Sequence, residues 1–171
     1  MSSRGTRIVL LVAAVVVFLD QLTKQWVTRS LELGESREII GSILKLHLIH
    51  NPGAAFSFLT GSTWVFTILA GVVSIVIVTQ ARKITNTYWM YAVGGVLGGA
   101  LGNFIDRLTN VPGFGIGHVI DFIEVPYWPI FNIADSSIFV SSISLVFLTY
   151  KGITMNGLTH KSHGASAAHH E

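Results

Sequence analysis

The 171-residue chain has no cysteine and few charged residues, since Asp, Glu, Lys and Arg make up only 12% of it. The lack of cysteine excludes disulfide bonds and thiolate chemistry. Average soluble domains carry about a quarter charged residues, whereas half of this chain is hydrophobic and its mean hydropathy is +0.59. The net charge of +2 is too small to indicate nucleic-acid binding. We therefore expect one compact membrane domain.

Four apolar segments each approach the ~20 residues that a helix needs to cross a bilayer. They cover residues 8–27, 64–81, 88–105 and 130–150. The sequence predicts a membrane all-α bundle of four transmembrane helices in one domain, residues 1–155, followed by a disordered cytoplasmic tail at 156–171. The basic N-terminus and first apolar run also suit a cleaved signal peptide. However, the run continues into Asp20 with no small-residue cleavage site, so we interpret it as a span.

Basic residues predict the orientation of the helices. They precede the first segment, separate the second from the third, and follow the fourth: Arg4, Arg7, Arg82, Lys83, Lys151 and Lys161. By the positive-inside rule these regions, and both termini, are cytoplasmic. The polar residues of the first, third and fourth segments then converge on the outer leaflet. These residues are Asp20, Lys24, Asn103, Asp106, Arg107, Asn132 and Asp135.

The two outer loops carry strand-like patterns. Residues 41–50 alternate apolar and polar side chains, and residues 119–125 form a second short candidate strand. Asn51-Pro52-Gly53 is typical of a turn. We expect a small extracytoplasmic β-sheet that rests on the helix ends.

Asp121 and Asp135 are both framed by apolar residues. Burying an unpaired carboxylate costs roughly several kcal/mol, so an aspartate in a membrane segment indicates function. An aspartic peptidase uses two carboxyls that share one proton: one takes a proton from water, and the other donates to the scissile carbonyl. Ion or proton transport and helix capping remain open alternatives, although Asp135 lies about five residues into its predicted span, deeper than a cap usually lies.

Other polar and small residues have structural interpretations. Asp20 and Lys24 are spaced to form an ion pair on one helix face, and we interpret this pair as structural. Arg107 either extends to the membrane interface or presents its guanidinium to a peptide carbonyl. A ridge of small residues predicts close packing inside the bundle rather than a dimer interface. It consists of Gly94, Gly95, Gly98, Gly99 and Gly102.

Five motifs, in their order and spacing, resemble those of the bacterial lipoprotein signal peptidases (signal peptidase II). They are Asp20-x-x-x-Lys24, Asn51-Pro-Gly-Ala-Ala-Phe-Ser, Gly99-Ala-Leu-Gly-Asn103-Phe-Ile-Asp106-Arg107, Val119-Ile-Asp121-Phe and Phe131-Asn132-Ile-Ala-Asp135-Ser. The resemblance covers about residues 5–152. It implies an aspartic endopeptidase of the bacterial cytoplasmic (inner) membrane, with its active site toward the outer leaflet. Such an enzyme removes signal peptides from diacylglyceryl-modified prolipoproteins and cleaves just before the lipid-modified cysteine.

The same resemblance assigns roles to individual residues. It implies that Asp121 and Asp135 are the catalytic pair and that Asn51 and Arg107 bind the substrate backbone. The residues that support the site are Asp20, Lys24, Gly53, Asn103, Asp106, Asn132 and Ala134. The implied partners are diacylglyceryl-prolipoprotein signal peptides and membrane lipids, with no metal, cofactor or nucleic acid. We expect a monomer.

Two other classes of protein are alternatives to a peptidase. A small proton-coupled transporter would use the carboxylates as a relay, but it should carry polar residues through the full membrane depth, often in an inverted repeat. Here the cytoplasmic halves of the segments are apolar. A non-catalytic scaffold packed through its glycines gives no reason for polar residues to gather on one leaflet.

Overall fold

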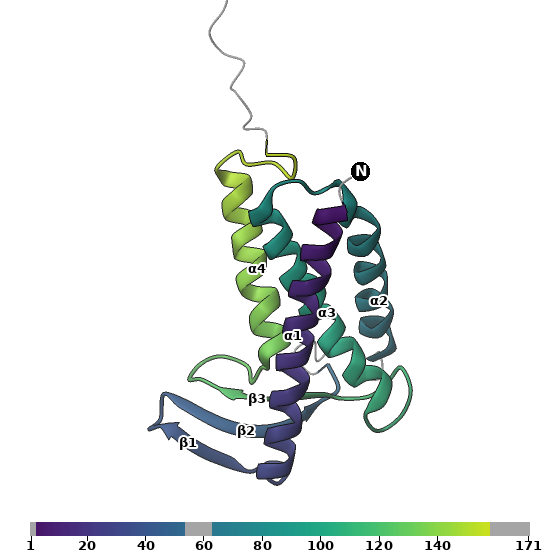
Figure 1. The fold of residues 1–171 in the computed structure, drawn as a ribbon. Coiled ribbons are helices and arrows are strands. Elements are labelled where there is room, and N and C mark those ends of the chain that lie inside the picture. Colours follow the sequence, from purple (N-terminus) through teal and green to yellow (C-terminus); the bar gives the residue numbers. More distant parts are fainter. Residues whose placement is uncertain (1–2, 54–62, 158–171) are drawn as a thin grey trace, which may run out of the picture.

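The computed structural model describes residues 3–53 and 63–157, in which four long helices stand on a small sheet (Figure 1). The helices are α1 (Ser3–Ser30), α2 (Thr63–Gln80), α3 (Thr87–Thr109) and α4 (Ile133–Tyr150). A short 3₁₀ helix, η2 (Ala81–Lys83), follows α2. The predicted helical bundle is confirmed, although α4 begins at Ile133 rather than at residue 130. Residues 54–57 of the second motif and residues 158–171 of the predicted tail lie outside the described residues.

Three helices, α1, α2 and α4, are long and apolar enough to cross a membrane. They expose large apolar side chains, such as Phe18 (65%) and Val146 (69%), as a lipid-facing surface does. In the described part of the chain, α3 does not meet this criterion. It packs against α1, α2 and α4, so many of its positions face other helices and carry glycine, Asn103 and Asp106 instead of lipid-facing residues. The described residues therefore form four long helices, of which three are candidate membrane spans, where the sequence predicted four.

The glycine ridge lets α3 approach its neighbours closely on two sides. A Cβ added at Gly98 would lie 2.6 Å from the Cβ of Val16 on α1. A Cβ added at Gly95 would overlap Ser141 on α4, and the carbonyl of Gly95 also accepts a hydrogen bond from Ser137 Oγ at 2.9 Å. The ridge is thus used for packing inside the bundle, as predicted.

The sheet lies across one end of the bundle, in the antiparallel order β1-β2-β3 (Figure 1). Its strands are β1 (Ser36–Ile40), β2 (Leu44–Asn51) and β3 (Val119–Glu124). Leu48 and Phe122 bury their side chains against Val27 and Leu31 at the end of α1. Strands β2 and β3 confirm the predicted sheet, but β1 was not predicted. All five β1 residues are exposed, so the strand lacks the alternating pattern that a buried face imposes.

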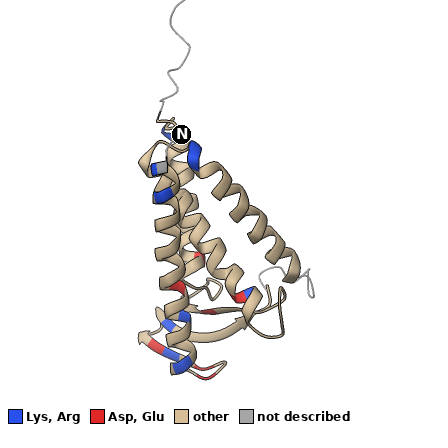
Figure 2. Ribbon diagram, turned by 45° about the vertical axis from the view of Figure 1, so that its right-hand side comes forward, with Lys and Arg blue, Asp and Glu red and all other residues tan. Residues whose placement is uncertain are grey.

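The two ends of the bundle differ in charge (Figure 2). The start of α1 and η2 carry basic residues and Lys151 follows α4, whereas the acidic residues lie toward the sheet together with further basic ones. The polar residues of α1, α3 and α4 all meet at the sheet end, as the sequence predicted. This shared end holds the candidate site.

Candidate active site

Strand β3 places Asp121 opposite Ile49 of β2, where its side chain is only 1% exposed. Its Oδ1 accepts a hydrogen bond from Asn132 Nδ2 at 2.6 Å, and its Oδ2 accepts one from Asn51 Nδ2 at 2.7 Å. Burial raises the pKa of Asp121 from 3.8 to about 7, although the hydrogen bond from Asn51 opposes the rise. The Asp121 carboxyl therefore binds and releases a proton near neutral pH.

Asp135 lies in the first turn of α4 and accepts a hydrogen bond at each carboxylate oxygen. Its Oδ1 accepts from Asn103 Nδ2 at 2.7 Å and its Oδ2 from the backbone N–H of Asn132 at 3.3 Å. Asn132 Oδ1 in turn accepts from the backbone N–H of Asp135, which completes a capping box. The expectation that Asp135 lies too deep to cap is wrong, because α4 begins three residues later than residue 130, at Ile133. Asp135 thus caps the helix through one oxygen and meets Asn103 through the other.

Asn132 joins the two aspartates and is fully buried. Its amide donates to Asp121 while its backbone N–H donates to Asp135. The chain reaches this position because Phe131 pairs with β3: its N–H donates to the carbonyl of Ile123 at 3.1 Å, and the N–H of Ile123 donates back at 2.8 Å. One asparagine therefore holds both carboxyls in a common frame.

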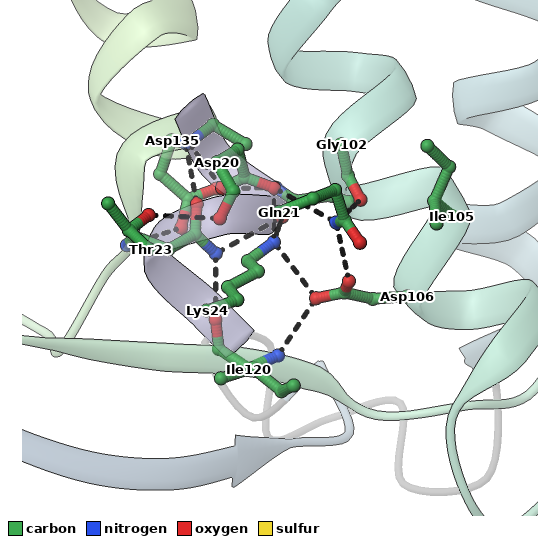
Figure 3. A network of polar contacts seen from close by, with 12 residues as sticks. Asp20, Gln21, Thr23, Lys24, Gly102, Ile105, Asp106, Ile120 and Asp135 are labelled. Carbon is green, nitrogen blue, oxygen red and sulfur yellow. Dashed lines mark hydrogen bonds and ion pairs between the residues drawn. The ribbon is translucent and has the colours of Figure 1, made fainter. Parts of the chain in front are cut away.

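A buried ionic network of Asp20, Lys24 and Asp106 lies next to the two aspartates and supports their positions (Figure 3). Lys24, only 2% exposed, places Nζ 2.8 Å from Asp20 Oδ2 and 2.9 Å from Asp106 Oδ2. It also donates to Asn103 Oδ1 at 3.2 Å. The predicted ion pair of Asp20 and Lys24 is confirmed, and Asp106 extends it to α3. Two carboxylates around one ammonium group offset much of the cost of burying these charges.

The network contacts the backbone beside each aspartate. Asp20 Oδ1 accepts a hydrogen bond from the N–H of Ala134, the residue before Asp135, at 2.9 Å. Asp106 Oδ2 accepts one from the N–H of Ile120, the residue before Asp121, at 3.0 Å (Figure 3). Ala134 is fully buried. The supporting residues that the sequence predicted therefore fix the chain on both sides of the site.

Arg107 and Gly53 lie on the open side of the aspartates. The Arg107 guanidinium is 5.8 Å from the ring centroid of Phe66, and its NH1 donates to the carbonyl of Asn103 at 3.1 Å. Of its two predicted orientations, Arg107 thus faces the site. Gly53 adopts φ 102° and donates its N–H to Asn51 Oδ1 at 2.8 Å. A residue with a side chain at position 53 would be strained at this φ, and its Cβ would lie close to the Phe66 ring.

These residues surround one cavity of about 630 Å³. It is lined by Ile49, His50, Asn51, Pro52, Gly53, Phe66, Arg107, Asp121, Trp128, Pro129, Ile130, Phe131 and Asp135. The structure thus brings together both predicted catalytic residues and both predicted substrate-binding residues in one cavity. Within residues 3–53 and 63–157, no group of three or more His, Cys, Asp or Glu residues is placed to hold a metal ion.

Several residues of the site were not predicted from the sequence, and three of them make notable contributions. Gln21 Nε2 donates to Asp106 Oδ1 at 3.0 Å and to Asp20 Oδ2 at 3.2 Å. Phe66 and Trp128 line the cavity. Gln21 had a usable signal, since it is a polar residue beside Asp20 in an otherwise apolar helix. The two aromatic residues had none, because isolated aromatic residues are common in membrane proteins.

The fold and the site define a membrane protein built around a pair of aspartates, one buried and one half-buried. The family model described as signal peptidase (SPase) II matches residues 12–151. The lipoprotein signal peptidase of Leifsonia xyli subsp. xyli (strain CTCB07) is 41% identical over 169 residues, 98% of this chain and 78% of that protein. That of Rhodococcus jostii (strain RHA1) is 45% identical over 146 residues, 85% of this chain and 74% of that protein. The chain belongs to the signal peptidase II family.

The fold agrees with this assignment. A bacterial membrane enzyme solved by the in meso method at 2.3 Å resolution superposes with a TM-score of 0.76 and 32% sequence identity. The match covers 92% of this chain and 94% of that one. The protein is thus a peptidase that removes signal peptides from prolipoproteins, as its motifs predicted. The transporter alternative gains no support.

Proposed function

We propose that Asp121 and Asp135 cleave the signal peptide of a diacylglyceryl-modified prolipoprotein just before its lipid-modified cysteine. One observation carries this proposal: both carboxyls line the same cavity and are hydrogen-bonded to the same buried asparagine, Asn132. Capping alone explains Asp135, but it gives no reason for a second, buried carboxyl to share this partner.

The environments of the two carboxyls suggest their roles. Because burial raises the pKa of Asp121 to about 7, a large share of Asp121 is protonated near neutral pH, and we assign the shared proton of the pair to it. Asp135, half-buried at the cavity wall, then takes a proton from water as the water oxygen attacks the scissile carbonyl carbon. Asp121 gives its proton to the carbonyl oxygen. As the tetrahedral intermediate collapses, the proton on Asp135 passes to the leaving amine, and the carboxyl of the cleaved signal peptide returns a proton to Asp121.

Arg107 and Asn51 hold the peptide against this pair. Arg107 places a cation with several donors in the cavity wall, where peptide carbonyls provide acceptors. Asn51 is already oriented by two contacts, from its Nδ2 to Asp121 and from the N–H of Gly53 to its Oδ1. Its placement beside Asp121 allows it to align the scissile bond.

The membrane orientation follows from the charges at the two ends. Helix α3 crosses the inner membrane together with the three apolar helices, and the basic end is cytoplasmic. The sheet and the aspartates then lie at the outer leaflet, where a signal peptide ends and a lipid anchor stays in the bilayer. Because the glycine ridge is used internally, one copy suffices and the enzyme acts as a monomer. Neither a metal nor a cofactor takes part.

A cleavage assay tests this proposal. Purified enzyme in detergent is given a prolipoprotein with and without its diacylglyceryl group, and cleavage is followed by gel shift. We expect cleavage of the lipidated form alone, and its loss in Asp135→Asn. Glu124→Gln is the matched control, since it also replaces a carboxylate by an amide, but outside the cavity. Glu124 ends β3, where it accepts a hydrogen bond from Ser36 and contacts His47. Equal cleavage of both substrates would refute the lipid requirement, and an active Asp135→Asn would refute the catalytic pair.

A further inference from the structure

A second, polar cavity lies between the sheet ends of α1 and α3, beside the ionic network. Its volume is about 280 Å³. Gln21, Lys24 and Arg29 of α1 and Asp106 of α3 are among the residues that line it. Of the residues that the structure describes, none lines both this cavity and the catalytic cavity. The proposed reaction therefore gives the second cavity no role.

Polar groups on the walls of this cavity are oriented as hydrogen-bond acceptors. Thr28 and Thr109 each donate the hydroxyl hydrogen to a backbone carbonyl of their own helix at 2.8 Å, so the lone pairs of these hydroxyls remain for a ligand. Gln21 directs its Nε2 to Asp106 Oδ1 at 3.0 Å and to Asp20 Oδ2 at 3.2 Å (Figure 3). Its Oε1 is then left as an acceptor. These walls favour a ligand that donates hydrogen bonds.

The floor of the cavity is negatively charged. Lys24 Nζ lies 2.8 Å from Asp20 Oδ2 and 2.9 Å from Asp106 Oδ2. Its third N–H is donated to Asn103 Oδ1 at 3.2 Å, so Lys24 has no N–H left for an anion. Two carboxylates thus surround a single ammonium group. The floor therefore favours a cationic donor, such as a primary ammonium group, and disfavours a phosphate.

The mouth of the cavity carries the opposite charge. Arg29 is exposed, and within residues 3–53 and 63–157 it forms no ion pair with an acidic side chain. Gln25, which is also exposed, lies one turn before it on the same helix face. A guanidinium group suits a phosphate, which it can bind through two parallel hydrogen bonds. The cavity thus combines an anion-binding mouth with a cation-binding floor.

The mouth lies at the level of the lipid headgroups. A helix needs about 20 residues to cross the hydrocarbon, so a span that starts after Arg7 ends near Val27. Phe18, Leu22 and Arg29 lie on one face of α1, because their spacing matches the helical repeat. The two apolar side chains are 65% and 51% exposed. The lipid-facing surface of α1 therefore leads directly to Arg29.

We infer that this cavity binds the headgroup of a phospholipid that carries both a phosphate and a primary amine. The phosphate pairs with Arg29 at the mouth, and the ammonium group donates to Gln21 and Asp106 at the floor. The volume suits a headgroup, since 280 Å³ equals about nine water molecules at ~30 Å³ each. The acyl chains stay outside the cavity, along Phe18 and Leu22. The bound lipid links α1 to α3 beside the ionic network.

Lipid binding by the purified full chain in nonionic detergent tests this inference. Native mass spectrometry reports how many lipids bind and how tightly. The probes are dioleoyl phosphatidylethanolamine and dioleoyl phosphatidylcholine, whose headgroups differ only in the N-methyl groups that remove the N–H donors. We expect one phosphatidylethanolamine to bind about tenfold more tightly than phosphatidylcholine. Equal affinities for the two lipids would overturn the inference.

Two variants separate the two ends of the cavity. Arg29→Gln should weaken the binding of both lipids about tenfold, because it removes the cation at the phosphate. The matched control Arg37→Gln, which changes an exposed arginine on β1, should not. Thr28→Val keeps the shape of the side chain but removes an acceptor, so it should reduce the preference for phosphatidylethanolamine about fivefold. Wild-type affinity in Arg29→Gln, or an unchanged preference in Thr28→Val, would contradict the site.

The soluble headgroup O-phosphoethanolamine distinguishes a membrane lipid from a free phosphate ester. It carries the same two charged groups but no acyl chains, so it lacks the contact with the apolar face of α1. We expect it not to displace phosphatidylethanolamine at equal concentration. Displacement at equal concentration would assign the cavity to a small soluble ligand and refute the lipid. Because binding is measured without a peptide substrate, neither result depends on the cleavage reaction.

Discussion

Helices α1 and α3 are held together by opposite means at their two ends. Toward the basic end, Val9 and Ala13 of α1 pack with Met90 and Leu97 of α3 in an apolar core. Toward the sheet, contact is made by charged and amide side chains that are almost fully buried: Asp20, Lys24, Asn103 and Asp106.

This difference shows which part of the interface serves stability alone. The apolar end demonstrates that ordinary packing is enough to dock α1 on α3. Replacing a buried ion network by apolar residues is often neutral or even stabilising, so stability does not account for the charged end. The hydrogen bonds from this charged end to Ala134, Ile120 and Asp135 explain why charged residues are present there. These bonds fix the two aspartates that the proposed reaction needs.

Replacing either proposed catalytic carboxyl by an amide should have the largest effect on activity. We expect Asp121→Asn and Asp135→Asn each to reduce kcat by about 10³-fold or more, since the amide neither takes a proton from water nor donates an acidic one. Both variants should remain folded in detergent, as judged by thermal unfolding. Near-normal turnover by either variant would show that it is not catalytic.

Breaking the charged end should have the largest effect on stability. Lys24→Met leaves Asp20 and Asp106 buried without their cation, at a cost of about 3–5 kcal/mol. At the apolar end, Leu97→Ala should cost about 2–5 kcal/mol by leaving a cavity. The contrast lies in activity per folded molecule: it should fall in Lys24→Met and stay normal in Leu97→Ala. If both variants kept normal kcat, the network would have no positioning role.

The pH dependence of unfolding should reveal the buried carboxyl of β3. Its folded pKa lies above its unfolded value, so the folded state binds the proton more tightly. The contribution of Asp121 is therefore fully present below about pH 4 and is lost as the pH rises toward 7. The size of the pKa rise sets an upper limit of roughly 4 kcal/mol. Asp121→Asn should flatten the thermal-unfolding profile over this range. A parallel profile in wild type and variant would contradict the raised pKa.

The smallest effect on stability should come from the charge in the cavity wall. Arg107→Ala should raise KM roughly tenfold while the unfolding temperature changes little, because the guanidinium faces the cavity rather than the buried ions. Arg37→Ala is the matched control, since the Arg37 side chain is exposed and its guanidinium pairs with Glu35, away from the cavity. Unfolding of Arg107→Ala under conditions where Arg37→Ala is stable would make Arg107 structural.

Local patterns were enough to predict the helices, two strands and the pair of aspartates, while the motifs added other residues of the site. Long apolar runs specify membrane-type helices, because every backbone polar group in a bilayer must be satisfied within the helix. Alternation specified β2 and β3. The high cost of burying a carboxylate singled out Asp121 and Asp135 among the residues of the chain, and the order of the motifs indicated the family.

Only the tertiary structure decided how these residues meet. Asn51 and Asp121 are 70 positions apart, and Lys24 and Asn103 are 79 apart, so no local period records their contacts. The residue at which α4 starts also depends on a contact between distant parts of the chain. Ile130 and Phe131 are as apolar as the helix that follows, yet Phe131 pairs its backbone with β3, and Asn132 becomes the cap. The sequence by itself therefore determined that Asp121 and Asp135 are costly to bury and lie near the same end of the helices. The pairing of backbone groups across the folded chain decided that Asp135 lies in the first turn of α4, joined to Asp121 through Asn132.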